Sequence, residues 1–183
     1  MANSNTQWFY IRRRWENKQV IRDDELSRLI KYAQGMGIKV SFKPYVRGQQ
    51  DRAQWTIDGE ITIFLTTRTP KIDKVLTLIH EIAHGKVFAK DGRKIHPELE
   101  EALNNEENKK KARKMIFEDE VDATKYWEEI YRDTNCKFDI NKLYSQREFD
   151  IWSYEVYYET NEFPNTKMIR TKLKQLNQKY GKK

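Results

Sequence analysis

The stretch KIDKVLTLIHEIAH, residues 71–84, decides how this chain folds and where its chemistry lies. Thr69-Pro70 before it supplies a helix cap and a proline at the first helical position, and Asp91-Gly92 supplies a stop. Its apolar residues surround the helix axis almost completely, so the helix that it predicts should be buried. These residues are Ile72, Val75, Leu76, Leu78, Ile79, Ile82 and Ala83.

This helix carries two of the three histidines of the chain, His80 and His84. Residues four apart share a helical face, so the two imidazoles can bind one cation. Glu81 follows the first histidine, beside any water on that cation, and a carboxylate there can take the proton of a zinc-bound water. The HExxH pattern therefore predicts a catalytic zinc site. The alternative is a pair of core histidines hydrogen-bonded to their neighbours.

A catalytic zinc normally has three protein ligands and a water, so a third ligand is needed. The metzincin pattern would require Gly at Val87 and His at Lys90, and it is excluded. Two sources remain open. His96 in KIHPELE is one, and the acidic stretch EDEVDAT, in which Glu118 and Asp122 share a helical face, is the other.

HEIAH followed by Glu118-x-x-Val121-Asp122 resembles the gluzincin arrangement, an HExxH helix and then a glutamate helix. The strand ITIFL before HEIAH and the stretch DATKYWEEIY after the glutamate are similar to small ImmA/IrrE-type metallopeptidases. The resemblance covers roughly residues 23–135. It implies an α+β, zincin-like fold and hydrolysis of a peptide bond in a protein partner, such as a transcriptional repressor.

By the same resemblance, His80, His84 and Glu118 would bind zinc and Glu81 would be the catalytic general base. Asp122 would orient a ligating histidine, and Glu120 is the alternative ligand. The pattern leaves the donor to the oxyanion open among Tyr126, Tyr154, Tyr157, Tyr158 and Arg132.

Two other readings stay open. SprT-like enzymes, which act around DNA, place a third histidine after HExxH, and His96 lies near that place, although Pro97 stands where that family has Gly. The third reading is a nucleic-acid-associated binding protein without catalysis. Arg12, Arg13 and Arg14, which lie among aromatic residues, can hold phosphates in that case.

The rest of the pattern predicts an α+β fold with a small, mostly antiparallel sheet. A helix should run from Asp23 or Asp24 to about Gln34, and IKVSFKPY should be a strand. Asp58-Gly59 predicts a hairpin within QWTIDGEITIFL. A long helical pattern from Pro97 to Asp133, with a break in its charged middle, and a helix in 147–163 should follow. We expect a single domain over 1–163 and a basic tail or helix over 164–183.

Composition narrows the class of protein. The net charge is +7, and seven of the basic residues lie between Pro164 and Lys183, which leaves 28 basic and 28 acidic residues in the rest. The basic tail leaves open a weak contact with nucleic acid beside a plain solvated helix. Cys136 is the only cysteine, so a reducing, cytoplasmic setting is expected. No membrane-spanning stretch and no signal peptide are expected.

Overall fold

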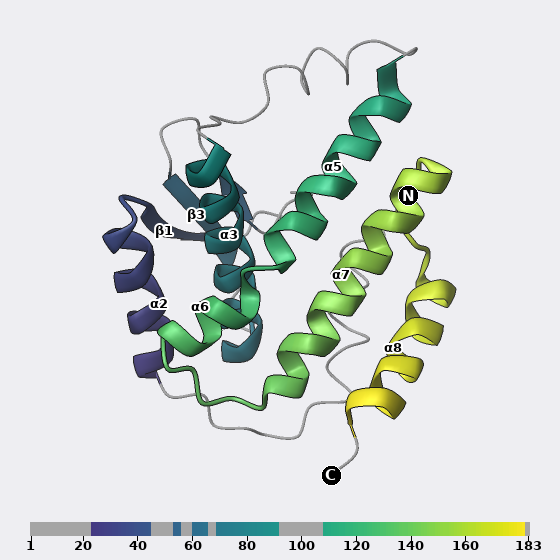
Figure 1. The fold of residues 1–183 in the computed structure, drawn as a ribbon. Coiled ribbons are helices and arrows are strands. Elements are labelled where there is room, and N and C mark those ends of the chain that lie inside the picture. The colour runs from purple at the N-terminus through teal and green to yellow at the C-terminus, as the bar shows by residue number, and fades with distance from the viewer. Residues whose placement is uncertain (1–22, 45–52, 56–59, 66–68, 92–107, 182–183) are drawn as a thin grey trace. The chain divides into compact units, whose positions relative to one another are not determined.

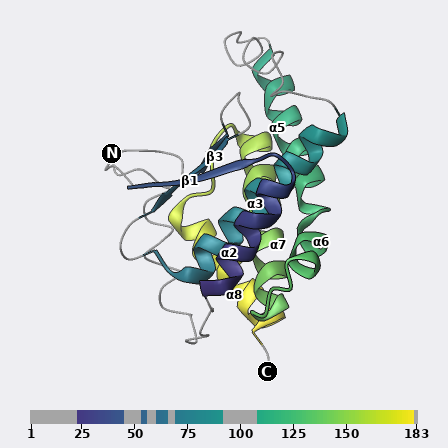
Figure 2. The same ribbon diagram turned by 90° about the vertical axis from the view of Figure 1, so that its left-hand side faces the viewer.

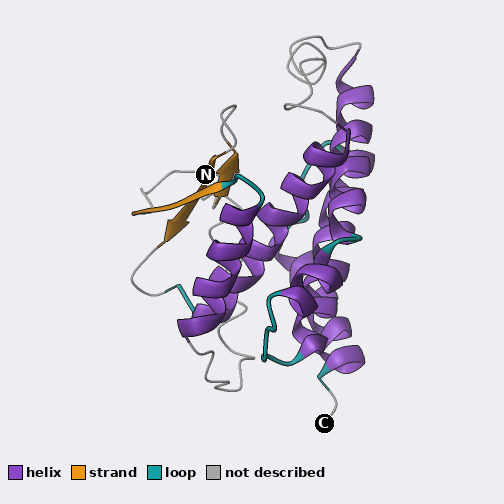
Figure 3. Cartoon of the chain, turned by 60° about the vertical axis from the view of Figure 1, so that its left-hand side comes forward, coloured by secondary structure: helices purple, strands orange, loops and turns teal. Residues whose placement is uncertain are grey.

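The computed structural model describes residues 23–44, 53–55, 60–65, 69–91 and 108–181 (Figure 1). This part of the chain is mostly helical with one small sheet, which confirms the α+β class in its coarse form (Figure 3). In chain order the elements are α2 (Asp23–Gly35), β1 (Lys39–Pro44), β2 (Ala53–Trp55), β3 (Glu60–Leu65), α3 (Lys71–Asp91), α5 (Lys109–Thr124), α6 (Trp127–Asp133), α7 (Ile140–Thr160) and α8 (Thr166–Tyr180).

The chain divides into two compact units. The sheet unit comprises residues 20–95 and 122–138, and the helical unit comprises residues 1–19, 96–121 and 139–183. The division in the middle of the chain falls within α5, between Val121 and Asp122. The expected extent of the domain, residues 1–163, stays a prediction.

The prediction of a mostly antiparallel sheet is wrong in one respect, because the sheet is mixed. Its strand order is β1-β3-β2, with β1 parallel to β3 from Lys39↔Glu60 to Pro44↔Leu65. The predicted hairpin is confirmed, since β2 runs antiparallel to β3, although the turn at 56–59 lies outside the described residues. Alternation of apolar and polar residues predicts where the strands lie, but not whether neighbouring strands run parallel or antiparallel. The chain places β3 between two earlier strands, and only tertiary pairing decides that order.

The core of the sheet unit forms around α3, as the sequence predicts. All seven predicted apolar residues of α3 are at most 6% exposed. They share the unit with the buried Leu29 and Ala33 of α2 and with Ile61 and Ile63 of β3, and Figure 2 shows α2 and α3 on one side of the strands. Full burial of each large apolar side chain stabilises the fold by about 1.5–3 kcal/mol. The first turns of the HEIAH helix are therefore held rigidly by the core.

Polar contacts fix α6 against α2 and α3. The guanidinium of Arg28 donates to the carbonyl oxygens of Thr134 and Asn135 just after α6, at 2.6 and 2.8 Å. The buried carboxylate of Glu25 accepts the backbone N–H of Lys137. The two bonds from Arg28 satisfy carbonyl groups that the end of a helix leaves without partners. The end of α6 is thereby held against α2.

Lys86 joins α3 to the same helices. Its Nζ donates to Glu129 of α6 at 2.5 Å and lies 5.4 Å from the ring of Tyr32 and 5.6 Å from that of Tyr126. Burial lowers the pKa of Lys86, but the bonds to Glu129 and Tyr32 outweigh it and raise the pKa above its usual value. Lys86 is therefore a fixed cation that ties three helices together.

In the helical unit, α7 and α8 pack side by side along an apolar seam. Phe149, Ile169 and Leu176 are buried there, with Trp152, Leu173 and Tyr180 against them. The side chain of Asp139 caps the start of α7, and Asn161 in the left-handed conformation ends it. The predicted helix in the aromatic segment 147–163 is confirmed, and the basic tail is a helix from Thr166 to Tyr180. Within the described residues, no helix combines the length and the apolar character that crossing a bilayer requires.

Glu148 of α7 receives three donors from α8. Lys172 Nζ lies at 3.1 Å, Lys179 Nζ at 2.6 Å and Tyr180 Oη at 2.9 Å from its carboxylate. Burial raises the pKa of Glu148, but these bonds outweigh burial and lower the pKa from 4.5 to about 2. Glu148 therefore fixes the side of α8 that faces α7.

Because the folded-state pKa of Glu148 lies below its ordinary value, its contribution to stability is complete above pH 4.5 and is lost as the pH falls towards 2. We expect the free energy of unfolding of the wild type to fall faster over this range than that of Glu148→Gln. The difference should stay under about 1 kcal/mol, because the group is largely solvent-screened. Urea unfolding across this pH range measures it, and parallel curves for the two proteins would contradict the role.

Candidate metal centre

His80 and His84 lie one turn apart on the same face of α3. Both are partly buried, and their Nε2 atoms face each other at 3.2 Å. The neighbouring residues Ile79, Ile82 and Ala83 are fully buried. The core therefore fixes the rotation of α3 about its axis, and with it the side from which the two imidazoles project. The prediction that the two histidines point the same way is confirmed.

The separation of the two Nε2 atoms suits a shared metal ion. A tetrahedral zinc with nitrogen ligands at about 2.0–2.1 Å holds two of them roughly 3.3–3.4 Å apart. Without an ion, the same distance is that of a hydrogen bond from the Nε2–H of one imidazole to Nε2 of the other. The distance between the two nitrogens is therefore compatible both with a hydrogen bond and with a shared zinc ion.

A third candidate ligand is Glu120, near the end of α5. One ligand atom each from His80, His84 and Glu120 lie within 4.8 Å of one another, and Glu120 is 7% exposed. Glu120 precedes the division in α5 by two residues, and the helix continues to the buried Ala123 and Thr124. Two imidazoles and one carboxylate make a ligand set that is compatible with a metal ion.

Glu118, the ligand that the resemblance implies, is not in this group. Its side chain is 58% exposed and pairs with Lys114 at 3.5 Å, one turn earlier on α5. The reason is helical geometry. Residues two positions apart on a helix point about 200° away from each other, so Glu118 and Glu120 cannot point the same way. The alternative that the sequence left open, Glu120, is the carboxylate beside the histidines.

Asp122 was expected to orient one of the histidines. Its carboxylate instead accepts a hydrogen bond from Lys125, three residues later, and its side chain is 46% exposed. It shares the face of Glu118 rather than that of Glu120, because it follows Glu118 by four residues. Among the described residues, the partner of the Asp122 carboxylate is Lys125 and not a histidine.

Two aromatic rings flank the histidines. Trp127 of α6, which is fully buried, stands edge-on to His80 with ring centroids 5.7 Å apart and planes at 81°. Phe88, one turn further along α3, stacks on His84 at 6.1 Å. Edge and stacked contacts of this kind restrict the orientation of an imidazole. Sequence reasoning missed Trp127, because only the turn at Lys125–Tyr126 between α5 and α6 brings it to the histidine.

Trp127 also has a buried indole Nε1–H for which the structure, in the part it describes, gives no hydrogen-bond partner. Truncation in Trp127→Ala should cost about 3–5 kcal/mol of stability through the cavity. Trp127→Phe leaves a smaller cavity. It also removes the buried N–H, and leaving such a group unpaired costs about 1–3 kcal/mol, so the two effects on stability offset each other. We therefore expect Trp127→Phe to stay within roughly 1 kcal/mol of the wild type. Urea denaturation of the two variants compares them, and equal losses would show that the N–H is satisfied.

Glu81 follows His80 on α3 and is partly buried. A step of one residue turns about 100° around the helix, so its carboxylate leaves the axis beside the two histidines rather than between them. That position suits a group that acts on a molecule bound at the cluster, and it is the position that the HExxH pattern predicts for the base.

The residues considered as oxyanion donors have other contacts. Tyr126 packs against Lys86, and Arg132 Nε donates to the carbonyl of Glu128 at 3.4 Å. In the helical unit, Tyr158 stacks on Phe117 of α5; Tyr154 and Tyr157 contact Phe163. His96 and the N-terminal arginines Arg12–Arg14 lie outside the described residues, so the SprT-like alternative is untested by this geometry.

No protein-family model, curated protein or solved structure matches this chain.

Proposed function

We propose that this chain is a zinc-dependent metallopeptidase in which His80, His84 and Glu120 hold the ion and Glu81 is the general base. The observation that carries the proposal is the facing pair of Nε2 atoms, 3.2 Å apart, with a buried carboxylate in the same cluster. Structural zinc sites use four protein ligands, whereas catalytic sites use three and keep one position open. The cluster offers three candidate ligands, the number that a catalytic zinc site uses.

In this proposal each residue of the cluster has a distinct task. A bound zinc ion would supply Lewis-acid chemistry, which polarises a peptide carbonyl and lowers the pKa of water. Glu81 would take a proton from the attacking water and return it to the leaving amine. Trp127 and Phe88 keep the imidazoles at a fixed angle, and the buried Glu120 would offset half of the charge of the ion. Imidazole and carboxylate together suit zinc better than calcium or magnesium.

The resemblance to gluzincins of the ImmA/IrrE type remains part of the proposal. It implies that the substrate is a protein partner, such as a transcriptional repressor, and that the enzyme works in the cytoplasm. The carboxylate beside the histidines supports a gluzincin-like ligand set, since Glu120 is buried and belongs to the same cluster of ligand atoms.

Removal and return of zinc test the proposal. We expect the metal-free chain to take up a single zinc ion, and at a free zinc concentration 100 times its Kd the protein should gain about 2.7 kcal/mol of stability. The zinc-loaded protein should cleave members of a mixed peptide library, and chelation should stop the cleavage. Zinc titration, thermal unfolding and mass spectrometry of the library measure these effects.

His80→Ala is the control for this experiment, because it removes one ligand and leaves a small side chain on the helix. It should show neither the stabilisation nor the cleavage. A wild type that takes up no zinc after reconstitution would refute the metal site. Zinc uptake without any cleavage of the library would leave a metal-binding protein and refute the peptidase.

A further inference from the structure

The C-terminal helix α8 has a basic stripe that the metal site does not use. Lys167, Arg170 and Lys174 are exposed and lie three and four residues apart, so they share one face of α8. The helix contains no acidic residue, and the part of the chain that the structure describes pairs none of these three with a carboxylate. We call these three residues the α8 basic stripe.

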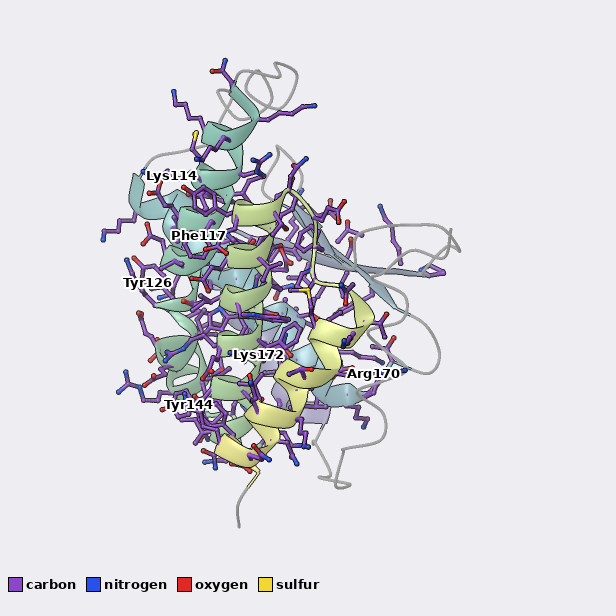
Figure 4. All side chains as sticks on the ribbon, turned by 90° about the vertical axis from the view of Figure 1, so that its right-hand side faces the viewer. Lys114, Phe117, Tyr126, Tyr144, Arg170 and Lys172 are labelled. Carbon is purple, nitrogen blue, oxygen red and sulfur yellow. The ribbon has the colours of Figure 1, made fainter. Side chains whose placement is uncertain are left out.

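The other two cations of α8 have a structural role and do not belong to the stripe. Lys172 and Lys179 point to Glu148 of α7, as the hydrogen bonds at 3.1 and 2.6 Å show. Figure 4 shows Lys172 on the side of α8 nearer α7 and Arg170 on the other side. The positive charges of α8 therefore divide into two that contact Glu148 and three that are exposed and contact no carboxylate of the described residues.

The stripe is not needed to stabilise the helix. The N-terminus of a helix carries a partial positive charge, so Lys167 and Arg170 in the first turns are electrostatically unfavourable there. The side chain of Asn165 already caps this end by accepting from the N–H groups of Lys167 and Met168. A row of unpaired cations that costs stability requires an explanation outside the fold.

The apolar side of α8 decides which kind of anionic partner the stripe fits. Ile169 and Leu176 are buried against Phe149, with Leu173 and Tyr180 packed beside them. An amphipathic helix that binds a membrane inserts such a face among the lipids, and here that face is already covered. A polyanion in solution needs only the charged face.

We propose that the α8 basic stripe binds the phosphate backbone of nucleic acid. Lys167 and Lys174 are seven positions apart, which is about 10 Å along the helix. Over that length one strand of a DNA duplex presents about three phosphates, at 3.4 Å each, so three cations meet three phosphates. Contacts of this type carry no base specificity, so the stripe holds the chain near nucleic acid without reading its sequence.

The test uses the full chain and a fluorescein-labelled DNA duplex of mixed sequence. With three phosphates neutralised, the logarithm of the binding constant should fall with the logarithm of the salt concentration with a slope of about −2.7. Affinity should therefore drop about 40-fold between 50 and 200 mM NaCl. The triple variant Lys167→Gln, Arg170→Gln, Lys174→Gln should lose this slope, because each contact contributes about one unit. Fluorescence anisotropy measures the binding.

The matched control is Lys31→Gln, Lys39→Gln, Lys43→Gln in the sheet unit, where all three lysines are exposed and the net charge changes equally. It should keep the affinity and the slope of the wild type. Circular dichroism confirms that α8 remains helical in the stripe variant. Equal losses in both variants, or no loss in the stripe variant, would overturn the proposal. Equal binding of polyglutamate or of phosphatidylserine vesicles would overturn the assignment to nucleic acid.

Discussion

Glu120→Ala is expected to abolish zinc binding at physiological zinc levels, whereas Glu118→Ala is expected to bind zinc like the wild type. The reason is that Glu120 belongs to the cluster of ligand atoms within 4.8 Å, and Glu118 is 58% exposed and paired with Lys114. Loss of a residue that only orients a ligand lowers the affinity of a metal site by roughly 10–100-fold, so loss of a direct ligand should lower it by more than about 100-fold. Competition with a chromophoric chelator measures both affinities.

The two variants are closely matched, since each removes one carboxylate from the same helix, two positions apart. Asp122→Ala extends the comparison, because Asp122 pairs with Lys125 and should also leave zinc affinity within about 2-fold. The reverse pattern, with zinc lost in Glu118→Ala and kept in Glu120→Ala, would restore the ligand set that the family resemblance implies. Loss in both would mean that helix α5 itself has changed, which circular dichroism would detect.

Glu81→Gln should bind zinc normally and lose peptide hydrolysis. The amide has the shape of the carboxylate but cannot accept a proton from water, and general-base catalysis contributes about 10²–10⁴-fold to rate. We expect turnover to fall by about that factor at every pH where the wild type is active. Zinc affinity is the readout that separates this effect from a damaged site, and it should be unchanged.

Glu81→Asp is the conservative partner of that variant. It keeps a carboxylate but withdraws it from the ion by one methylene, so activity should lie between that of Glu81→Gln and the wild type. Retention of full turnover by Glu81→Gln would exclude Glu81 as the base. Loss of zinc together with activity would place Glu81 among the ligands instead.

Most elements of the fold can be predicted from local sequence patterns. The apolar residues of KIDKVLTLIHEIAH give a buried helix, and the structure buries all seven of them. The turn signal at Asp58-Gly59 gives the hairpin of β2 and β3. Each of these features depends on residues that are neighbours in sequence, where backbone geometry fixes which side chains share a face. The direction of β1 relative to β3 depends on residues that are far apart in sequence, and the prediction of a mostly antiparallel sheet is wrong for this pair.

The same limit explains what the sequence says of the site. The facing imidazoles follow from spacing alone, because residues four apart on any helix lie on one side. The positions of Glu120 and Trp127 beside the histidines do not follow from spacing, because both residues come from segments more than thirty residues away. In EDEVDAT either Glu118 or Glu120 can turn towards α3, and composition gives no preference. The structure groups Glu120 with the two histidines, and the turn at Lys125–Tyr126 brings Trp127 to His80.

The sequence by itself therefore determined the helix, the pair of histidines and the type of chemistry that they permit, because 3.6 residues per turn is a local property. Only the tertiary structure decided which carboxylate completes the cluster, which ring stands against His80 and which cations of α8 remain open to a partner. These depend on how a helix is rotated against its neighbours. Burial of apolar surface sets that rotation over the whole unit, and no single stretch of the chain encodes it.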